Sequence, residues 1–176
     1  MPAYLRPSLW ILFVVIAVII GLDQWTKALA TQMLQYGKPV YVMPVLNWTL
    51  LHNYGAAFSF LSDQGGWQRW FFMALSSIVS LAFIVWLIRL PKEQWIVRFS
   101  LTLIIAGAIG NLIDRVAMGY VVDFIHFHWH DSYFPAFNIA DMAITGGAGF
   151  MLLDMFFGPA EAGEESADAV KISKAK

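Results

Sequence analysis

Residues 137–153 read Phe-Asn-Ile-Ala-Asp-Met-Ala-Ile-Thr-Gly-Gly-Ala-Gly-Phe-Met-Leu-Leu, an apolar run that contains a single carboxylate, Asp141. The run has the composition of a membrane-spanning helix. A charged side chain in the hydrocarbon region is unfavourable by about 2.5 to 3.5 kcal/mol on insertion scales, so such a residue usually marks a function and faces protein. The stretch therefore predicts a membrane protein with an acidic site.

The composition of the whole chain supports this interpretation. Of the 176 residues, 59% are hydrophobic and only 13% are charged, and the mean hydropathy is +0.63, which is far more apolar than an average soluble domain. The formal net charge of -1 gives no electrostatic reason to expect a nucleic-acid partner. Because the chain has no cysteine, disulfides, thiolate metal sites and a cysteine nucleophile are excluded.

Four apolar runs approach the roughly 20 residues that a helix needs to cross a bilayer. The predicted spans are residues 8–30, 67–90, 95–113 and 139–157. Gly158-Pro159 ends the last one, because proline cannot continue a helix. We predict that residues 1–158 form one membrane-embedded domain. The polar segment 159–176 has no apolar periodicity and is expected to be a disordered cytoplasmic tail.

The first run also permits a second interpretation, a cleaved signal peptide, because residues 28–30 form a small-x-small pattern. Asp23, Trp25 and Lys27 would crowd the cleavage region. A retained helix is therefore favoured.

Basic residues near the ends of the spans predict the orientation. The side that holds both termini has Arg6, Arg89, Lys92, Arg98 and the lysines of the tail. The opposite side has Lys27, Lys38, Arg69 and Arg115. Lys27 and Arg115 each lie beside an aspartate at a span end, so we interpret them as site residues and not as loop charges. We expect both termini to be cytoplasmic.

The segment between the first two spans has a different pattern. Residues 41–53, Tyr-Val-Met-Pro-Val-Leu-Asn-Trp-Thr-Leu-Leu-His-Asn, are rich in β-branched and aromatic types and favour short strands. The predicted fold class is therefore an all-α membrane protein with four transmembrane helices and a small β-rich outer subdomain between helices 1 and 2.

Several polar residues cluster at the outer ends of the spans. On the third helix, Gly107, Asn111 and Asp114 share one face, and small residues at four-residue spacing on the third and fourth helices predict close helix approach. On the first helix, Asp23 and Lys27 have the i, i+4 spacing of an ion pair, which is as compatible with a structural role as with a functional one.

Asp123 and Asp141 differ from these residues because neither has a basic residue one turn away. They are separated by a loop containing Pro135, so the chain can bring them together at the outer end of spans three and four. Two carboxylates in one site share a proton, which suits the water activation of an aspartic protease. Asn138 has the position of a helix N-cap three residues before Asp141. The alternative is that each aspartate only caps a helix or anchors a span end.

Five segments of the chain resemble, in order, the lipoprotein signal peptidases, the signal peptidase II family of bacteria. These segments are Asp-Gln-Trp-Thr-Lys (23–27), Asn-Tyr-Gly-Ala-Ala-Phe-Ser (53–59), Gly-Ala-Ile-Gly-Asn-Leu-Ile-Asp-Arg (107–115), Val-Val-Asp-Phe (121–124) and Phe-Asn-Ile-Ala-Asp (137–141). Five ordered motifs are far more specific than any single motif. Together with the four spans, they cover nearly the whole chain apart from the tail.

The resemblance implies an aspartic endopeptidase of the bacterial inner membrane, with its active site toward the outer leaflet. Such an enzyme removes signal peptides from prolipoproteins, cutting just before a cysteine that carries diacylglycerol. It implies that Asp123 and Asp141 are the catalytic dyad, with no cofactor or metal. The expected partners are the prolipoprotein substrate and membrane lipids, and the enzyme is expected to act as a monomer. By the same match, substrate-site residues are Asn53, Asn111, Arg115 and Asn138, and structural polar residues are Asp23, Lys27 and Asp114.

Three alternatives remain open from the residues alone. A serine-lysine signal peptidase would use Ser59 with Lys27, and a transporter or proton relay would also bury acids in a helix bundle. The alternating run His126-Phe-His-Trp-His130 would place three imidazoles on one face of a strand, as a metal site could use. Neither HExxH nor GxSxG occurs, which weakens metalloprotease and serine-hydrolase interpretations.

Overall fold

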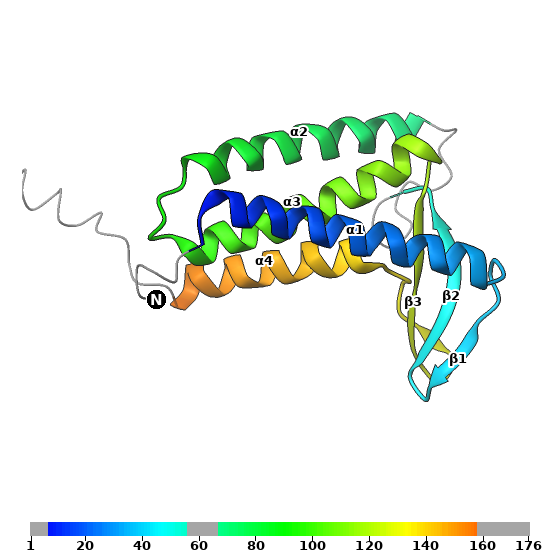
Figure 1. The fold of residues 1–176 in the computed structure, drawn as a ribbon. Helices are drawn as coiled ribbons and strands as arrows, with labels where there is room; N and C mark the ends of the chain where they lie inside the picture. The colour runs from blue at the N-terminus through cyan, green and yellow to red at the C-terminus, as the bar shows by residue number, and fades with distance from the viewer. Residues whose placement is uncertain (1–6, 56–66, 158–176) are drawn as a thin grey trace, which may run out of the picture.

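A computed structural model describes residues 7–55 and 67–157 of the chain. Figure 1 shows helices lying side by side, with a small sheet across one end of the bundle. The helices are α1 (Leu9–Met33), α2 (Trp67–Arg89), α3 (Trp95–Ala117) and α4 (Ile139–Phe157). In the described part of the chain, these four are long and apolar enough to cross a membrane. The predicted membrane fold is confirmed, while the predicted tail at 159–176 lies outside the described residues.

Two helices extend further than the sequence predicted. α1 continues to Met33 beyond the expected end at residue 30, and α3 continues to Ala117 beyond residue 113. The extra turn of α3 is stabilised from α2, because the Arg69 guanidinium donates at 3.1 and 3.0 Å to two carbonyl oxygens of that turn. Gly119 then leaves the helix with a φ of +87°, a conformation that favours glycine.

The helices pack around α3. Leu101 and Ile105 of α3 are almost fully buried against Leu12 of α1 and Leu87 of α2. The contact with α4 depends on glycine: a side chain at Gly147 would lie 2.6 Å from the Ser100 carbonyl oxygen. Small residues therefore allow the close approach that the sequence predicted, although Gly149, at the end of one predicted small-residue pair, faces open space.

The sheet draws strands from two separate parts of the chain. Its order is β1-β2-β3-β4, and each neighbouring pair is antiparallel. The strands β1 (Val40–Met43) and β2 (Leu46–Asn53) lie between α1 and α2, as predicted. The other two, β3 (Val121–Trp129) and β4 (Ser132–Tyr133), come from the connection between α3 and α4, which the sequence interpretation treated as a loop. β3 forms a strand because it pairs antiparallel with β2, and its residues Val121–Ile125 are buried.

The site lies where the sheet meets the bundle. Asp123 follows two residues after the start of β3, and Asp141 lies in the first turn of α4. Figure 1 places the beginning of α1 and the end of α4 at the opposite end of the bundle from the sheet. The two acids are 18 positions apart in the sequence. The chain returns through β3 and β4, which brings the start of β3 and the start of α4 together.

Candidate active site

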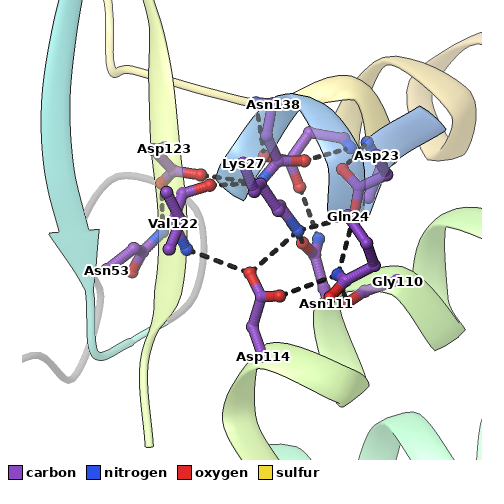
Figure 2. Close-up of polar contacts among 12 residues, drawn as sticks. Asp23, Gln24, Lys27, Asn53, Gly110, Asn111, Asp114, Val122, Asp123 and Asn138 are labelled. Carbon is purple, nitrogen blue, oxygen red and sulfur yellow. Dashed lines mark hydrogen bonds and ion pairs between the residues drawn. The ribbon is translucent and has the colours of Figure 1, made fainter. Parts of the chain in front are cut away.

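Lys27 forms the centre of a buried polar cluster between α1 and α3. Its ammonium lies 2.8 Å from Asp23 Oδ2 and 2.9 Å from Asp114 Oδ2, and it donates to Asn111 Oδ1 at 2.9 Å. The Gln24 side chain donates to Asp114 Oδ1 at 2.8 Å (Figure 2). The Lys27 side chain is only 3% exposed. The predicted Asp23–Lys27 ion pair is therefore present, and a second helix extends it.

The two acids of this cluster also hold the elements that carry the candidate dyad. Asp114 Oδ2 accepts a hydrogen bond from the Val122 backbone nitrogen at 3.1 Å, next to Asp123. Asp23 Oδ1 accepts one from the Ala140 backbone nitrogen at 2.8 Å, next to Asp141. Each bond gives a buried backbone N–H group a carboxylate acceptor. The ion cluster thus fixes the start of β3 and the start of α4 against the bundle.

Asn138 connects Asp123 to Asp141. Its side-chain nitrogen donates to Asp123 Oδ1 at 2.7 Å, as Figure 2 shows, and its backbone nitrogen donates to Asp141 Oδ2 at 3.3 Å. Its side-chain oxygen accepts from the Asp141 backbone nitrogen at 2.9 Å, which is the geometry of the predicted N-cap. Asn138 is fully buried. One residue therefore sets the relative position of both acids.

Two further asparagines contact the acids. Asn111 donates from its side chain to Asp141 Oδ1 at 2.7 Å, and Asn53 donates to Asp123 Oδ2 at 3.2 Å. Asn111 also accepts from Lys27, so it lies between the ion cluster and Asp141. Among the described residues, neither Asp123 nor Asp141 forms a salt bridge.

The electrostatics of Asp123 follow from this arrangement. Burial, followed by the nearby charge of Asp141, raises the pKa of Asp123 from 3.8 to about 7. Hydrogen bonds from Asn53 and Asn138, and the charge of Lys27, act in the opposite direction. Because of the raised pKa, both the protonated and the ionised form of Asp123 are populated near neutral pH.

Both acids line one cavity of about 1300 Å³. The part of its lining that comes from the helices includes the apolar residues Phe72 and Val79 of α2 and Ile144 of α4. The other part of its lining follows the sheet. The acids therefore lie at the junction between a groove inside the helix bundle and a space beneath the strands.

Arg115 tethers the end of β2 to this cavity. Its guanidinium donates to the Gly55 carbonyl oxygen at 2.8 Å and lies 5.4 Å from the centre of the Phe72 ring. It lines the cavity without pairing with either acid. The sequence missed two contributors, Gln24 and Arg69. Gln24 lies inside a quoted motif but carries no charge, while Arg69 was counted only as a loop charge.

The histidine run does not have the geometry expected of a three-imidazole face. β3 ends at Trp129, and His130 lies in the following turn with a φ of +53°. His126 and His128 remain on the strand; His128 stacks on the Tyr133 ring, and His126 lies against the same ring at a tilted angle. In the described part of the chain, no group of three acidic, histidine or cysteine side chains could hold a metal ion. Ser59, the nucleophile of the serine-lysine alternative, lies outside the described residues.

The four apolar helices indicate a multi-pass membrane protein, and comparison with known proteins gives its family. Residues 15–157 match the family described as Signal peptidase (SPase) II. The chain belongs to the signal peptidase II family and is a peptidase, as the sequence resemblance predicted. Membership of a peptidase family counts against the transporter alternative.

Individual relatives support the same assignment. The lipoprotein signal peptidase of Acinetobacter baumannii is 56% identical over 154 residues, which are 88% of this chain and 86% of the relative. That of Shewanella woodyi is 50% identical over 132 residues, 75% of each chain. A solved structure titled as a bacterial membrane enzyme is 30% identical with a TM-score of 0.77, covering 86% of this chain and 90% of the other.

Proposed function

We propose that Asp123 and Asp141 form a catalytic dyad that removes signal peptides from diacylglyceryl-modified prolipoproteins. Cleavage falls on the N-terminal side of the lipid-bearing cysteine. The observation that carries this proposal is the convergence of the two acids, which Asn138 joins by hydrogen bonds and which line one cavity. The names of the relatives, lipoprotein signal peptidase, support the substrate class.

The environments of the two acids suggest different roles. Asp123 has a pKa of about 7, so it carries the proton in a large share of molecules at neutral pH and donates it to the carbonyl oxygen of the scissile bond. Asp141 accepts hydrogen bonds from Asn111 and from the Asn138 backbone at the N-terminus of α4. Those donors and the helix dipole suit an ionised carboxylate that removes a proton from water.

In this mechanism, protons move only between the two acids, the water and the substrate. Asp141 takes a proton from the water as its oxygen attacks the carbonyl carbon, and Asp123 protonates the carbonyl oxygen to give a neutral tetrahedral intermediate. Collapse of the intermediate breaks the C–N bond, and the amine of the cysteine leaves with a proton from Asp141. Return of the intermediate's hydroxyl proton to Asp123 restores the starting state.

The cavity also supports the orientation of the substrate. Its apolar groove between α2, α3 and α4 can hold the hydrophobic helix of a signal peptide within the bilayer. We place the enzyme in the bacterial inner membrane, with the dyad toward the outer leaflet and both termini cytoplasmic. α1 begins and α4 ends at the end of the bundle opposite the sheet (Figure 1), which supports a common side for the termini. One copy supplies both acids, so we expect a monomer to be sufficient.

The proposal is tested with the purified full-length chain in detergent and a diacylated prolipoprotein. Asp123→Asn and Asp141→Asn should each lower turnover by about a thousandfold or more, since each removes a group that exchanges a proton with the reacting atoms. The matched control is Asp131→Asn, an exposed acid beyond the end of β3, which should retain turnover. Full turnover by either dyad variant would refute the mechanism.

A further inference from the structure

The cavity that contains the dyad continues to the β3–β4 hairpin, where Tyr133, Phe134 and Phe137 line it. The same three residues line a second space of about 590 Å³. We call this second space the aromatic hollow; its lining residues are Phe127, His128, Trp129, Ser132, Tyr133, Phe134 and Phe137. The dyad cavity and the aromatic hollow therefore share these three aromatic residues and lie next to each other.

His126 supplies a polar group at this wall. It follows Asp123 by three residues on β3, lines the dyad cavity, and lies 4.7 Å from the Tyr133 ring, centre to centre. Its Nδ1 is enclosed by protein and has no hydrogen-bond partner. An unpaired N–H group is rarer in protein interiors than an unpaired acceptor, so the neutral ring carries its hydrogen on Nε2.

The imidazole is neutral under ordinary conditions. Burial, followed by the nearby charge of His128, lowers the pKa of His126 below its usual 6.5. His126 lines the dyad cavity, and only its Nδ1 is among the enclosed, unpaired atoms, so we infer that Nε2 is the nitrogen that contacts a ligand. His126 thus offers the cavity one uncharged hydrogen-bond donor.

An uncharged hydrogen-bond donor beside aromatic rings favours a ligand that carries an uncharged acceptor on an apolar chain. Among the described residues no Lys or Arg lines the aromatic hollow, and Arg115, which lines the dyad cavity, donates to the Gly55 carbonyl oxygen. A phosphate group would therefore lack a free charged partner here. A glyceryl ester fits, because it joins a carbonyl oxygen to an acyl chain. Aromatic side chains such as Trp129 and Tyr133, which are 70% and 51% exposed, gather at the membrane–water interface, where lipid headgroups begin.

We propose that His126 donates a hydrogen bond from Nε2 to a glyceryl ester carbonyl of the substrate, and that the aromatic hollow holds the attached acyl chain. This inference rests on the proposed function and adds a residue that recognises the lipid. It makes His126 a specificity residue, separate from the acids that act on the peptide bond. A peptide carbonyl after the cysteine offers the same acceptor, so the experiment must separate the two sources.

The test compares two synthetic prolipoprotein peptides that differ only in the lipid linkage, one diester and one diether. The diether keeps both chains but lacks the ester carbonyls. One hydrogen bond corresponds to a preference of about fivefold in kcat/KM for the diester in the wild-type protein. His126→Phe keeps an aromatic ring but removes the donor, so it should reduce the diester rate to the diether rate. His126→Gln, which restores an N–H donor, should recover part of the preference.

His130→Asn is the matched control. His130 is exposed in the turn after β3 and lines neither the dyad cavity nor the aromatic hollow, so the diester preference should persist in that variant. An equal loss on both substrates in His126→Phe would assign the donor to a peptide carbonyl and overturn the proposal. An unchanged preference would also overturn it. These outcomes are measured as a ratio of two rates in an active enzyme. They can therefore be told apart from a refutation of the dyad mechanism, which would appear as full turnover by Asp123→Asn.

Discussion

Two acidic clusters lie next to each other at the sheet end of the bundle, and they have opposite electrostatic character. In the first, Asp23 and Asp114 share the ammonium of Lys27 at 2.8 and 2.9 Å. In the second, Asp123 and Asp141 have asparagine partners and, among the described residues, no salt bridge. Asp23, Asp114 and Asp123 are buried and Asp141 is partly buried, but only the two acids of the second cluster line the large cavity.

Under the proposed mechanism, the first cluster supports the site and the second performs the chemistry. A buried carboxylate that is paired with a buried cation is held in a fixed position, so it serves as an acceptor for backbone groups. Asp114 and Asp23 do this for Val122 and Ala140. A buried carboxylate beside another carboxylate has a raised pKa and can exchange a proton near neutral pH, as acid–base catalysis requires.

The largest expected effect comes from removing the cation of the first cluster. Lys27→Met leaves Asp23 and Asp114 buried without a counter-ion, and we expect it to lower the free energy of unfolding by about 3 to 5 kcal/mol. Denaturant titration in detergent measures this loss. Lys38→Met, at an exposed position, should change the stability by less than about 0.5 kcal/mol. Equal stability of the two variants would mean that the clusters do not differ as described.

The second prediction concerns the pH dependence of the dyad. The pKa of Asp123 is raised to about 7, so the protonated form that the mechanism requires is present below that pH and is lost as the pH rises through it. We expect kcat/KM to fall about tenfold per pH unit on the alkaline side. Asn53→Ala removes a hydrogen bond that opposes the raised pKa, so it should move the alkaline limb to higher pH. A profile without this limb, or a shift to lower pH, would contradict the assignment of the proton to Asp123.

Asn138 allows its two roles to be separated. Asn138→Ser keeps an N-cap oxygen for α4 but removes the amide that donates to Asp123. We expect kcat to fall by about tenfold, because Asp123 loses the hydrogen bond that positions it for the reaction. Stability should be nearly retained, because the serine still caps α4. Asn138→Ala should lose stability as well, by about 1 kcal/mol. If the serine variant kept full activity, positioning of Asp123 by the amide would be excluded.

The smallest effect is an increase in stability. Because the folded pKa of Asp123 lies above its ordinary value of 3.8, its contribution to stability is present below that value and lost as the pH rises through about 7. Asp123→Asn should therefore raise the free energy of unfolding at pH 8 by about 1 kcal/mol, with no gain at pH 4. The gain is small because the new amide faces the donors of Asn53 and Asn138.

The corresponding substitution in the first cluster should change the free energy of unfolding in the opposite direction. Asp114→Asn weakens the ion pair with Lys27 and should lower stability at pH 8. Thermal unfolding of the two variants side by side compares the clusters directly. A stability loss in Asp123→Asn at pH 8 would contradict the raised pKa.

The membrane spans could be predicted from the sequence more completely than the ends of the helices and the strands of the sheet. Apolar length predicted all four helices, and β-branched and aromatic composition predicted β1 and β2, because both signals are local. The helical ends of α1 and α3 were placed too early, since Arg69 from another helix supports the last turn of α3. β3 was treated as a loop because its strand character depends on pairing with β2, far away in the chain.

The sequence by itself determined that the chain lies in a membrane, that its family is signal peptidase II, and which acids lack a local counter-ion. Those conclusions need only hydropathy, spacing and ordered motifs. Only the tertiary structure decided that Asp114, and not Asp23 alone, pairs with Lys27, and that Asn138 joins Asp123 to Asp141. The physical reason is that burial and charge pairing act over a few ångströms in space, between groups that α3, β3 and α4 bring together from distant positions in the chain.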